Sequence, residues 1–226
     1  MISHKDKFIF IHIPKCAGTS IERVLNPSDD TTFIMEPDHR SIRMIERPIL
    51  LGPLISSFDN LFQFALRQRY ALRRHKNPNN RLTVTSDQFE QYFKFTIVRN
   101  PWSRAYSWYK NCIRDPNHRV RFGLPENITL ADFLKKTVGR GALRPQIAWL
   151  QNFGGTIPVD FIGRFESLND DFQTICKELG LSQLRLPHDR NGNTQDYRAE
   201  YDTQSKYLVE NAYRSEIELF GYSFEA

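Results

Sequence analysis

The sequence predicts an α/β fold in which helices cover a central parallel β-sheet. Three short apolar segments, at residues 7–13, 93–98 and 159–162, have the hydrophobic pattern of buried strands, and a helical segment follows each of them. Strands that alternate with helices along a chain are typical of a parallel sheet with helices packed on its faces. Ligands of such sheets bind at the carboxyl ends of the strands. The turns that follow Ile13 and Val98 are therefore the first candidates for a binding site.

The first two strand–helix pairs have clear boundaries. Pro14 ends the first strand, and residues 18–25 can form the helix that follows. After the second strand, Asn100 is a suitable N-cap and Pro101 occupies the first helical position. These signals predict a helix over residues 101–112.

Two further helices are expected in the last third of the chain. Ser167 can cap a helix that follows the third strand, and Gly180 lies where its apolar stripe stops. The final helix is expected from about Thr203 to Phe220, with Gly221 directly after it.

The segment at about 47–92 interrupts this alternation, and we interpret it as a helical, basic insert within a single domain that spans residues 1–226. Residues 58–72 have helical periodicity, with several apolar side chains on one face. No acidic residue occurs between Asn60 and Ser86. The basic residues of this stretch are Arg67, Arg69, Arg73, Arg74, Lys76 and Arg81. The stretch 67–81 is either a solvated surface or a binding site for a polyanionic acceptor.

The composition is that of a globular protein. Of the 226 residues, 40% are hydrophobic and 25% are charged, which excludes a disordered or collagen-like chain. The net charge of +5 suits an anionic ligand, but we expect no nucleic-acid partner because no zinc-finger, RRM or basic-helix signature occurs. The three cysteines lack CxxC spacing, which favours a reducing compartment. With no signal peptide and no membrane span apparent, we expect a cytoplasmic protein.

The first candidate turn has the sequence HIPKCAGTS at residues 12–20. It combines free backbone N–H groups, the amino end of a helix, the hydroxyls of Thr19 and Ser20 and the ammonium group of Lys15, and such groups hold phosphates. A Walker A loop has its lysine directly after the last glycine, whereas here Lys15 precedes Gly18. An ordinary magnesium-dependent kinase is therefore disfavoured. The alternative is an ordinary strand-to-helix turn with capping hydroxyls.

The second candidate turn has the sequence IVRNPWSRAYSWY at residues 97–109. Arg99 leaves the end of a strand, and Ser107 follows it by eight residues along the next helix. Arg104 shares a helical face with Ser107. An arginine with a serine hydroxyl suits a terminal phosphate. The alternative is a surface arginine and a serine that packs between helices.

Together, the two motifs resemble the sulfotransferases that use 3′-phosphoadenosine 5′-phosphosulfate (PAPS). The similarity is greater to the branch that contains bacterial sulfotransferases and the heparan and chondroitin sulfate 2-O-sulfotransferases. The segments DFIGRFESLNDDF at 160–172 and SEIELFGYSF at 215–224 extend the resemblance. It implies a three-layer α/β sandwich with a central parallel sheet, like that of the P-loop kinases. It also implies transfer of a sulfuryl group from PAPS to a hydroxyl or amine acceptor, which leaves 3′,5′-adenosine bisphosphate (PAP), with no metal expected.

The resemblance also assigns roles to residues of both motifs. The first loop would bind the 5′-phosphosulfate, and Lys15 would neutralise the charge that develops on the leaving oxygen. The residues of this loop are Lys15, Cys16, Ala17, Gly18, Thr19 and Ser20. Arg99 and Ser107 match the spacing of the pair that binds the 3′-phosphate. Arg164, after the third strand, can reach the adenine or ribose, with an ion pair to Glu166 or Asp170 as the alternative.

Family members remove the acceptor proton with a histidine or a glutamate. His39, in PDHRSIRMIE, resembles a histidine that follows the first helix in bacterial relatives, and it is the favoured general base. His75, His118, His188 and Glu36 are the alternatives.

The nature of the acceptor stays open. A hydroxyl-bearing small molecule and an anionic glycan both fit the sequence. Two other classes of function are weighed against a sulfotransferase. One is a nucleotide kinase or other phosphotransferase of the P-loop type, and the other is a non-catalytic module that binds nucleotides or polyanions.

Overall fold

The computed structural model describes residues 1–25, 36–181, 184–187 and 196–225. The chain divides into two compact units, which we call the sheet unit and the helical unit. The sheet unit contains residues 1–13, 17–98 and 147–187, and the helical unit contains residues 14–16, 99–146 and 188–226. The single domain over residues 1–226 stays a prediction, and His188 lies outside the described residues.

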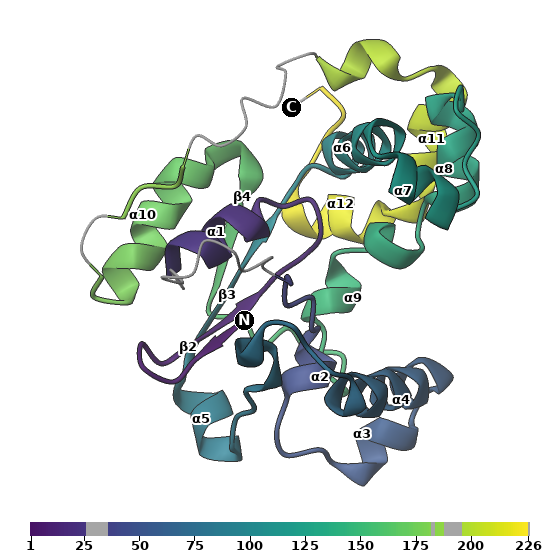
Figure 1. The fold of residues 1–226 in the computed structure, drawn as a ribbon. Helices are drawn as coiled ribbons and strands as arrows, with labels where there is room; N and C mark the ends of the chain where they lie inside the picture. Colours follow the sequence, from purple (N-terminus) through teal and green to yellow (C-terminus); the bar gives the residue numbers. More distant parts are fainter. Residues whose placement is uncertain (26–35, 182–183, 188–195, 226) are drawn as a thin grey trace. The chain divides into compact units, whose positions relative to one another are not determined.

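The sheet unit is built on four strands in the order β1-β2-β3-β4 (Figure 1). The strands are β1 (Ile2–Ser3), β2 (Phe8–Ile11), β3 (Phe93–Val98) and β4 (Phe161–Arg164). β1 runs antiparallel to β2, and the other neighbours are parallel. All four side chains of β2 are buried, as its unbroken apolar run predicts. The mostly parallel sheet flanked by helices confirms the predicted α/β class, in the P-loop-like arrangement.

The predicted strand at 159–162 was placed two residues too early, because β4 begins at Phe161. Asp160 does contact the neighbouring strand, since its N–H donates to the carbonyl of Lys94. However, it is the Asp160 carboxylate that accepts the N–H of Lys94, at 2.6 Å. The Asp160 side chain thus replaces a backbone carbonyl as the acceptor, and the regular β3–β4 hydrogen bonding starts after Asp160.

Helices of the sheet unit follow the strands and fill the insert. They are α1 (Gly18–Leu25), α2 (Ile42–Ile45), α3 (Leu51–Ile55), α4 (Phe58–Leu72), η1 (Pro78–Arg81), α5 (Ser86–Gln91), α9 (Ile147–Leu150), η3 (Phe165–Ser167) and α10 (Leu168–Glu178). Helix α10 packs on β4. The predicted cap of α10 by the side chain of Ser167 was wrong, because this hydroxyl donates to Asp171 Oδ2 instead.

The helical unit packs its helices around a core of its own. They are α6 (Pro101–Arg114), α7 (Pro116–Arg121), α8 (Leu130–Thr137), η2 (Gly141–Leu143), η4 (Tyr197–Glu200), α11 (Thr203–Ala212) and α12 (Arg214–Phe220). Asn100 caps α6 as predicted, since its side chain accepts from the N–H groups of Trp102 and Ser103. The core includes Trp102, Phe133 and Tyr213.

The final helix is divided, which the sequence pattern did not indicate. Tyr213 separates α11 from α12, with φ −120° and ψ 20°. Its side chain is buried, and its hydroxyl donates to the carbonyl of Leu143 at 2.5 Å and accepts from the N–H of Gly139. These tertiary hydrogen bonds hold Tyr213 in a non-helical conformation that periodicity alone does not reveal.

A helix long and apolar enough to cross a bilayer is absent from the part of the chain that the structure describes.

Candidate active site

The turn after the first buried strand has an unusual backbone. Lys15 and Ala17 have φ angles of 70° and 62°, in the left-handed region that residues other than glycine rarely adopt. The carbonyl of Ala17 then accepts the N–H groups of Ser20 and Ile21, which starts α1. Backbone strain of this kind costs on the order of 1–3 kcal/mol per residue and is concentrated at functional sites. The turn is therefore a strained connection, and it is a candidate functional loop on that ground.

Gly18 is required in this turn because the ring of His12 lies against it. A Cβ atom at Gly18 would come within 2.0 Å of His12 Cδ2. The ring is fixed by Glu22 of α1, whose Oε1 lies 3.0 Å from His12 Nδ1, and both side chains are buried. Burial alone would raise the pKa of Glu22, but the hydrogen bond and charge of His12 lower it below its ordinary value. The ring of His12 thus packs against the loop, held in place by α1.

Lys15 and Arg99, which belong to the two predicted turns, contact each other in the helical unit. Arg99 Nη1 donates to the carbonyl of Lys15 at 3.1 Å. The ammonium group of Lys15 is half-buried, 3.4 Å from Oδ1 of Asn111 and 5.9 Å from the ring centre of Trp108. The structure therefore brings the lysine of the first motif and the arginine of the second to the same helix, α6.

Ser107 lies between the α6 side chains that these two cations contact. Arg99 Nε donates to Ser103 Oγ at 2.9 Å, and Lys15 reaches Asn111. Ser103, Ser107 and Asn111 are four residues apart in turn, so they share one face of the helix. Ser107 is thus flanked by a guanidinium group on one side and an ammonium group on the other. This face of α6 therefore carries two separate cationic groups, which can bind two different anionic groups of one ligand.

Arg104, which shares a helical face with Ser107, is committed to the backbone around the loop. Its side chain is fully buried and its guanidinium group donates to three backbone carbonyls. The acceptors are Pro14 at 3.1 Å, Arg144 at 3.0 Å and Ala142 at 2.6 Å. Arg104 therefore holds the start of the loop in place.

Gln146 and Glu216 support the site and were missed by the sequence analysis. The Gln146 side chain accepts the N–H of Arg99 at 2.8 Å and donates to its carbonyl at 2.9 Å. Glu216 accepts from both the backbone and the side chain of Gln146, and both residues are buried. Glu216 lies within the segment SEIELFGYSF, and this position was the one sequence signal for its role. Gln146 belongs to no motif, so no sequence signal indicated its role.

Cys16 faces inward. Its buried Sγ lies 3.4 Å from Oε1 of Gln146 and 3.7 Å from the carbonyl of Pro14. Any contribution of Cys16 to an anion therefore comes from its backbone. Thr19 is exposed and Ser20 is half-buried in the first turn of α1, so their hydroxyls are accessible.

His39 is held in the sheet unit with one ring nitrogen committed. Its Nδ1 lies 3.0 Å from the carbonyl of His12, and its ring contacts those of His12 and Trp149. A carbonyl only accepts, so Nδ1 carries the proton and Nε2 has the lone pair. Burial, together with the neighbouring His12, lowers the pKa of His39 to about 4. The ring is therefore neutral near pH 7, and no residue in the described ranges hydrogen-bonds to Nε2.

The alternative bases have other partners. His75 is buried, with Nε2 at 2.9 Å from the carbonyl of Tyr70 and Nδ1 at 3.7 Å from Glu36. Glu36 accepts the N–H of Lys76 and pairs with Arg73 at 2.6 Å. These contacts join Glu36 to the insert and give both residues a structural role.

His118 lies in the helical unit near Lys15. Its Nδ1 is 3.0 Å from Asp115 Oδ2 and 3.3 Å from the amide nitrogen of Asn111, which Lys15 contacts. Among the alternative bases that the structure describes, His118 is the one in the same unit as Lys15, and both side chains contact Asn111.

Arg164 is exposed at the end of β4 and pairs in register with Val98, the residue before Arg99. Its N–H donates to Asp171 Oδ2 at 2.6 Å. The end of β4 therefore lies beside the end of β3 within the sheet unit, as the prediction for Arg164 requires.

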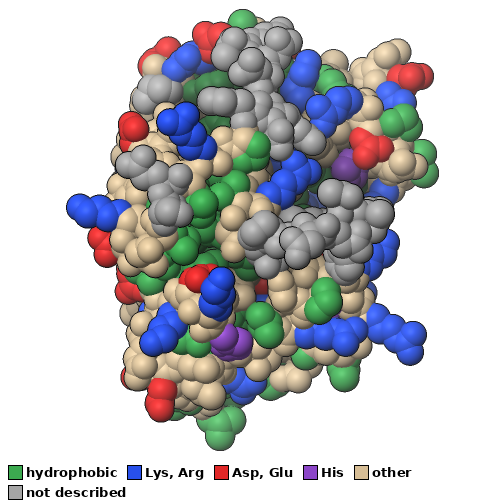
Figure 2. Space-filling view, turned by 60° about the vertical axis from the view of Figure 1, so that its left-hand side comes forward, with side chains coloured by type: hydrophobic (Ala, Val, Ile, Leu, Met, Phe, Trp, Pro, Cys, Tyr) green, Lys and Arg blue, Asp and Glu red, His purple; other side chains and the backbone are tan. Residues whose placement is uncertain are grey.

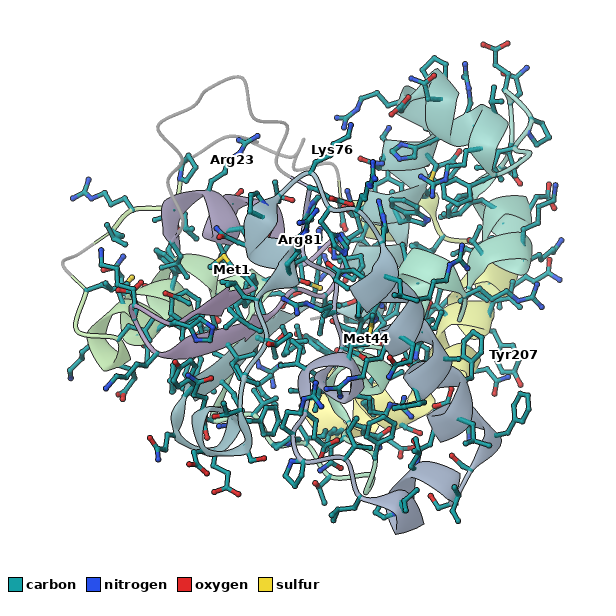
Figure 3. All side chains as sticks on the ribbon, turned by 60° about the horizontal axis from the view of Figure 1, so that its bottom comes forward. Met1, Arg23, Met44, Lys76, Arg81 and Tyr207 are labelled. Atoms are coloured by element: carbon teal, nitrogen blue, oxygen red, sulfur yellow. The ribbon has the colours of Figure 1, made fainter. Side chains whose placement is uncertain are left out.

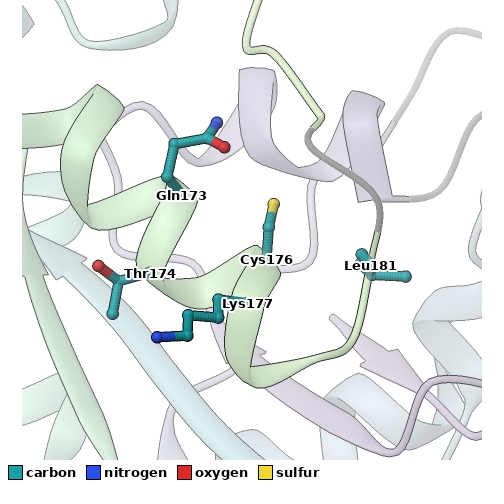
Figure 4. A pocket seen from close by; sticks show the side chains of 5 residues that line it. All are labelled: Gln173, Thr174, Cys176, Lys177 and Leu181. Carbon is teal, nitrogen blue, oxygen red and sulfur yellow. The ribbon is translucent and has the colours of Figure 1, made fainter.

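A cavity of about 400 Å³ lies along α10 (Figure 4). The residues that line it are Gln173, Thr174, Cys176, Lys177 and Leu181. None of them belongs to the predicted site. Within the ranges that the structure describes, no cluster of His, Cys, Asp and Glu side chains could hold a metal ion.

Comparison with known proteins identifies the class that this loop and helix define. The sulfotransferase family model matches residues 1–223, and the chain belongs to the sulfotransferase family. An uncharacterized protein of Archaeoglobus fulgidus is 32% identical over 97 residues, which are 42% of this chain and 73% of that protein. No solved structure matches the chain. The family assignment confirms the resemblance drawn from the two motifs.

Proposed function

We propose that this protein transfers a sulfuryl group from PAPS to a hydroxyl or amine acceptor. The observation that carries the proposal is the position of Ser107 on α6, with the contacts of Arg99 on one side and those of Lys15 on the other. A donor with phosphates at both its 3′ and 5′ positions needs two cationic points that are held apart, and this helix face provides them. PAPS supplies a sulfuryl group bonded to a phosphate oxygen, so transfer breaks that S–O bond and forms a new one to the acceptor.

The chain's own residues divide the work of positioning and charge stabilisation. Lys15 neutralises the charge that develops on the leaving oxygen, while Arg99 and Ser107 hold the 3′-phosphate. The backbone N–H groups of residues 16–19 and the hydroxyls of Thr19 and Ser20 hold the 5′-phosphate. Arg164 binds the adenosine part. The sulfuryl group carries less charge than a terminal phosphate, so these cations replace a metal.

His39 is the proposed general base. With Nδ1 held by the carbonyl of His12, Nε2 faces a fixed direction and takes the proton of the acceptor hydroxyl. The acceptor is a hydroxyl-bearing small molecule or an anionic glycan. We place the protein in the cytoplasm, which the three free, buried cysteines support.

The donor assignment is tested by calorimetric titration without magnesium, with PAP compared with AMP, which lacks the 3′-phosphate. PAP should bind much more tightly. Arg99→Ala should weaken PAP binding about 10- to 100-fold, the effect of losing hydrogen bonds to a charged group, and leave AMP unchanged. Arg114→Ala, at an exposed arginine of the same helix, is the matched control.

Each other outcome favours a different function. Equal affinity for PAP and AMP contradicts the 3′-phosphate site. Binding of Mg-ATP with phosphoryl transfer indicates a kinase. Tight PAP binding without release of PAP from PAPS, over a broad set of acceptors, indicates a binding module.

The pKa of His39 predicts an unusual pH dependence. A base with a pKa of about 4 stays unprotonated through neutral and mildly acidic pH. As the pH is lowered, kcat/KM should therefore fall near pH 4 rather than near pH 6.5. His39→Gln should reduce turnover about 100-fold or more and leave PAP affinity unchanged. If His118→Gln has this effect and His39→Gln does not, the base is in the helical unit.

The same shift predicts how stability changes with pH. The folded pKa of His39 is depressed below the ordinary value of 6.5, so protons bind the unfolded chain preferentially as the pH falls from 6.5 toward 4. Stability should therefore be full above pH 6.5 and decline below it. Urea unfolding between pH 7.5 and 5 measures this slope, and His39→Gln should flatten it. An unchanged slope in that variant would show that another group titrates.

A further inference from the structure

Helix α4 buries three polar side chains on one face and exposes large apolar side chains on the other. Asn60, Gln63 and Arg67 are buried, and Gln63 is 0% exposed. Phe58 at the start of the helix is 85% exposed and Leu72 at its end is 86% exposed. Soluble helices normally have the opposite arrangement. The apolar face that the sequence pattern identifies at residues 58–72 therefore points to the surface.

Buried hydrogen bonds fix this orientation. The Asn60 amide donates to the carbonyls of Pro53 and Phe153, at 2.7 and 2.9 Å, and accepts from Arg43 at 2.9 Å. The Arg67 guanidinium group donates to the carbonyls of Arg43 and Glu46. Rotation of α4 to cover its phenylalanines would leave these polar groups without hydrogen-bond partners, which is unfavourable for buried groups. The outward apolar face is thus a stable feature of the fold.

Helix α3, which packs against α4, extends the exposed apolar surface. Leu51 on this helix is 76% exposed. We call the combined set the α3–α4 apolar surface. Its members are Leu50, Leu51, Ile55, Phe58, Leu61, Phe62 and Leu72. Seven large apolar side chains on adjoining helices form more than the isolated exposed residues that any surface has, and such patches mark interaction sites.

Basic side chains accompany this surface. Arg69 is exposed on the same face of α4, and Arg74 is exposed after it. Lys76 and Arg81, labelled in Figure 3, are also exposed. Arg73 pairs with Glu36, yet its side chain is 62% exposed. On the face drawn in Figure 2, Lys and Arg side chains stand out beside exposed hydrophobic ones. Asp59, an acidic residue of α4, is itself paired with Arg43.

We propose that the α3–α4 apolar surface docks the protein onto an anionic lipid surface. Leucine and phenylalanine side chains enter the boundary between headgroups and acyl chains, while arginines contact lipid phosphates. A second copy of this chain fits this surface less well. A two-fold interface would place the basic stretch of one copy against that of the other. No acidic residue occurs between Asn60 and Ser86 to pair with these basic residues. The inference does not rest on the proposed function, since it concerns attachment and not sulfuryl transfer.

The test is cosedimentation of the full chain with phosphatidylcholine vesicles, with and without phosphatidylglycerol. Binding should require phosphatidylglycerol and weaken with salt. The variant Phe58→Ser with Leu72→Ser should weaken binding about 10- to 100-fold through lost apolar burial. Arg69→Ser with Arg74→Ser should weaken it about 30-fold, since each basic residue near the membrane contributes about 1 kcal/mol. These side chains are exposed, so thermal melts should show that the variants fold.

The matched control is Val120→Ser with Leu219→Ser, two exposed apolar residues of the helical unit. It should leave vesicle binding unchanged, and an equal loss would show that binding is nonspecific. Failure to bind anionic vesicles overturns the proposal. The proposal is also overturned if soluble heparin displaces the vesicles and if Phe58→Ser with Leu72→Ser leaves heparin binding unchanged. That result would indicate a polyanion site. A dimer in sedimentation equilibrium that this variant dissociates would assign the surface to a second copy.

Discussion

Replacing Lys15 with alanine should lower the turnover number about 100- to 1000-fold, the effect typical of removing one group that stabilises developing charge. The affinity for PAP should fall less than about 10-fold, because the backbone N–H groups, Arg99 and Ser107 still hold both phosphates. The large loss of turnover is expected because the backbone of Lys15 is fixed while its ammonium group can turn to the donor. The strained turn and the bond from Arg99 to the Lys15 carbonyl fix its backbone, and its contact with Asn111 is with a neutral side chain that a donor can displace.

Two measurements check this prediction. Release of PAP from PAPS in the presence of an acceptor reports turnover, and calorimetry with PAP reports binding. Lys15→Arg should retain part of the turnover because it keeps the charge. Lys110→Ala, at an exposed lysine of α6, is the matched control and should behave like the native protein. Equal losses in turnover and PAP binding would show that Lys15 acts in binding alone.

Replacing Gly18 with alanine should disrupt the loop. The new Cβ would lie 2.0 Å from His12 Cδ2, and the ring cannot move away without breaking its contact with Glu22. We expect a loss of about 1–3 kcal/mol in the free energy of unfolding, as for overpacked cores, and loss of measurable PAP binding. Urea unfolding and calorimetry measure the two effects.

Gly154→Ala is the control for the glycine substitution itself. An added Cβ at Gly154 would come no closer than 3.4 Å to Asn152 Oδ1, an ordinary contact, so alanine there should change the free energy of unfolding little. The clash is tested further by combining Gly18→Ala with His12→Ala. The two changes should be less harmful together than the sum of their separate effects. Additive losses would contradict the contact between His12 and the loop.

Local signals were enough to predict much of the fold. The helix Gly18–Leu25 and the strand Phe93–Val98 have the predicted boundaries, because a proline, an N-cap or an unbroken apolar run acts within a few residues. The two loop motifs were likewise enough to predict the family. The division at Tyr213 could not be predicted, because its cause is a hydrogen bond to Leu143, 70 residues away in the chain.

The partners of the site residues could be known only from the tertiary structure. Arg104 has the same helical neighbours whether it binds a phosphate or a carbonyl, and only packing shows that Pro14 accepts its hydrogen bond. The protonated nitrogen of His39 depends on the His12 carbonyl.

Helix α4 shows most directly which features depend on local sequence and which depend on tertiary structure. Periodicity identifies its apolar face, but which face is buried depends on whether the rest of the molecule offers hydrogen-bond partners to Asn60 and Arg67. The sequence by itself determined the first two strand–helix pairs, the two turns and the family, since these depend on neighbouring residues. Only the tertiary structure decided which groups meet, because those contacts join positions far apart in the chain.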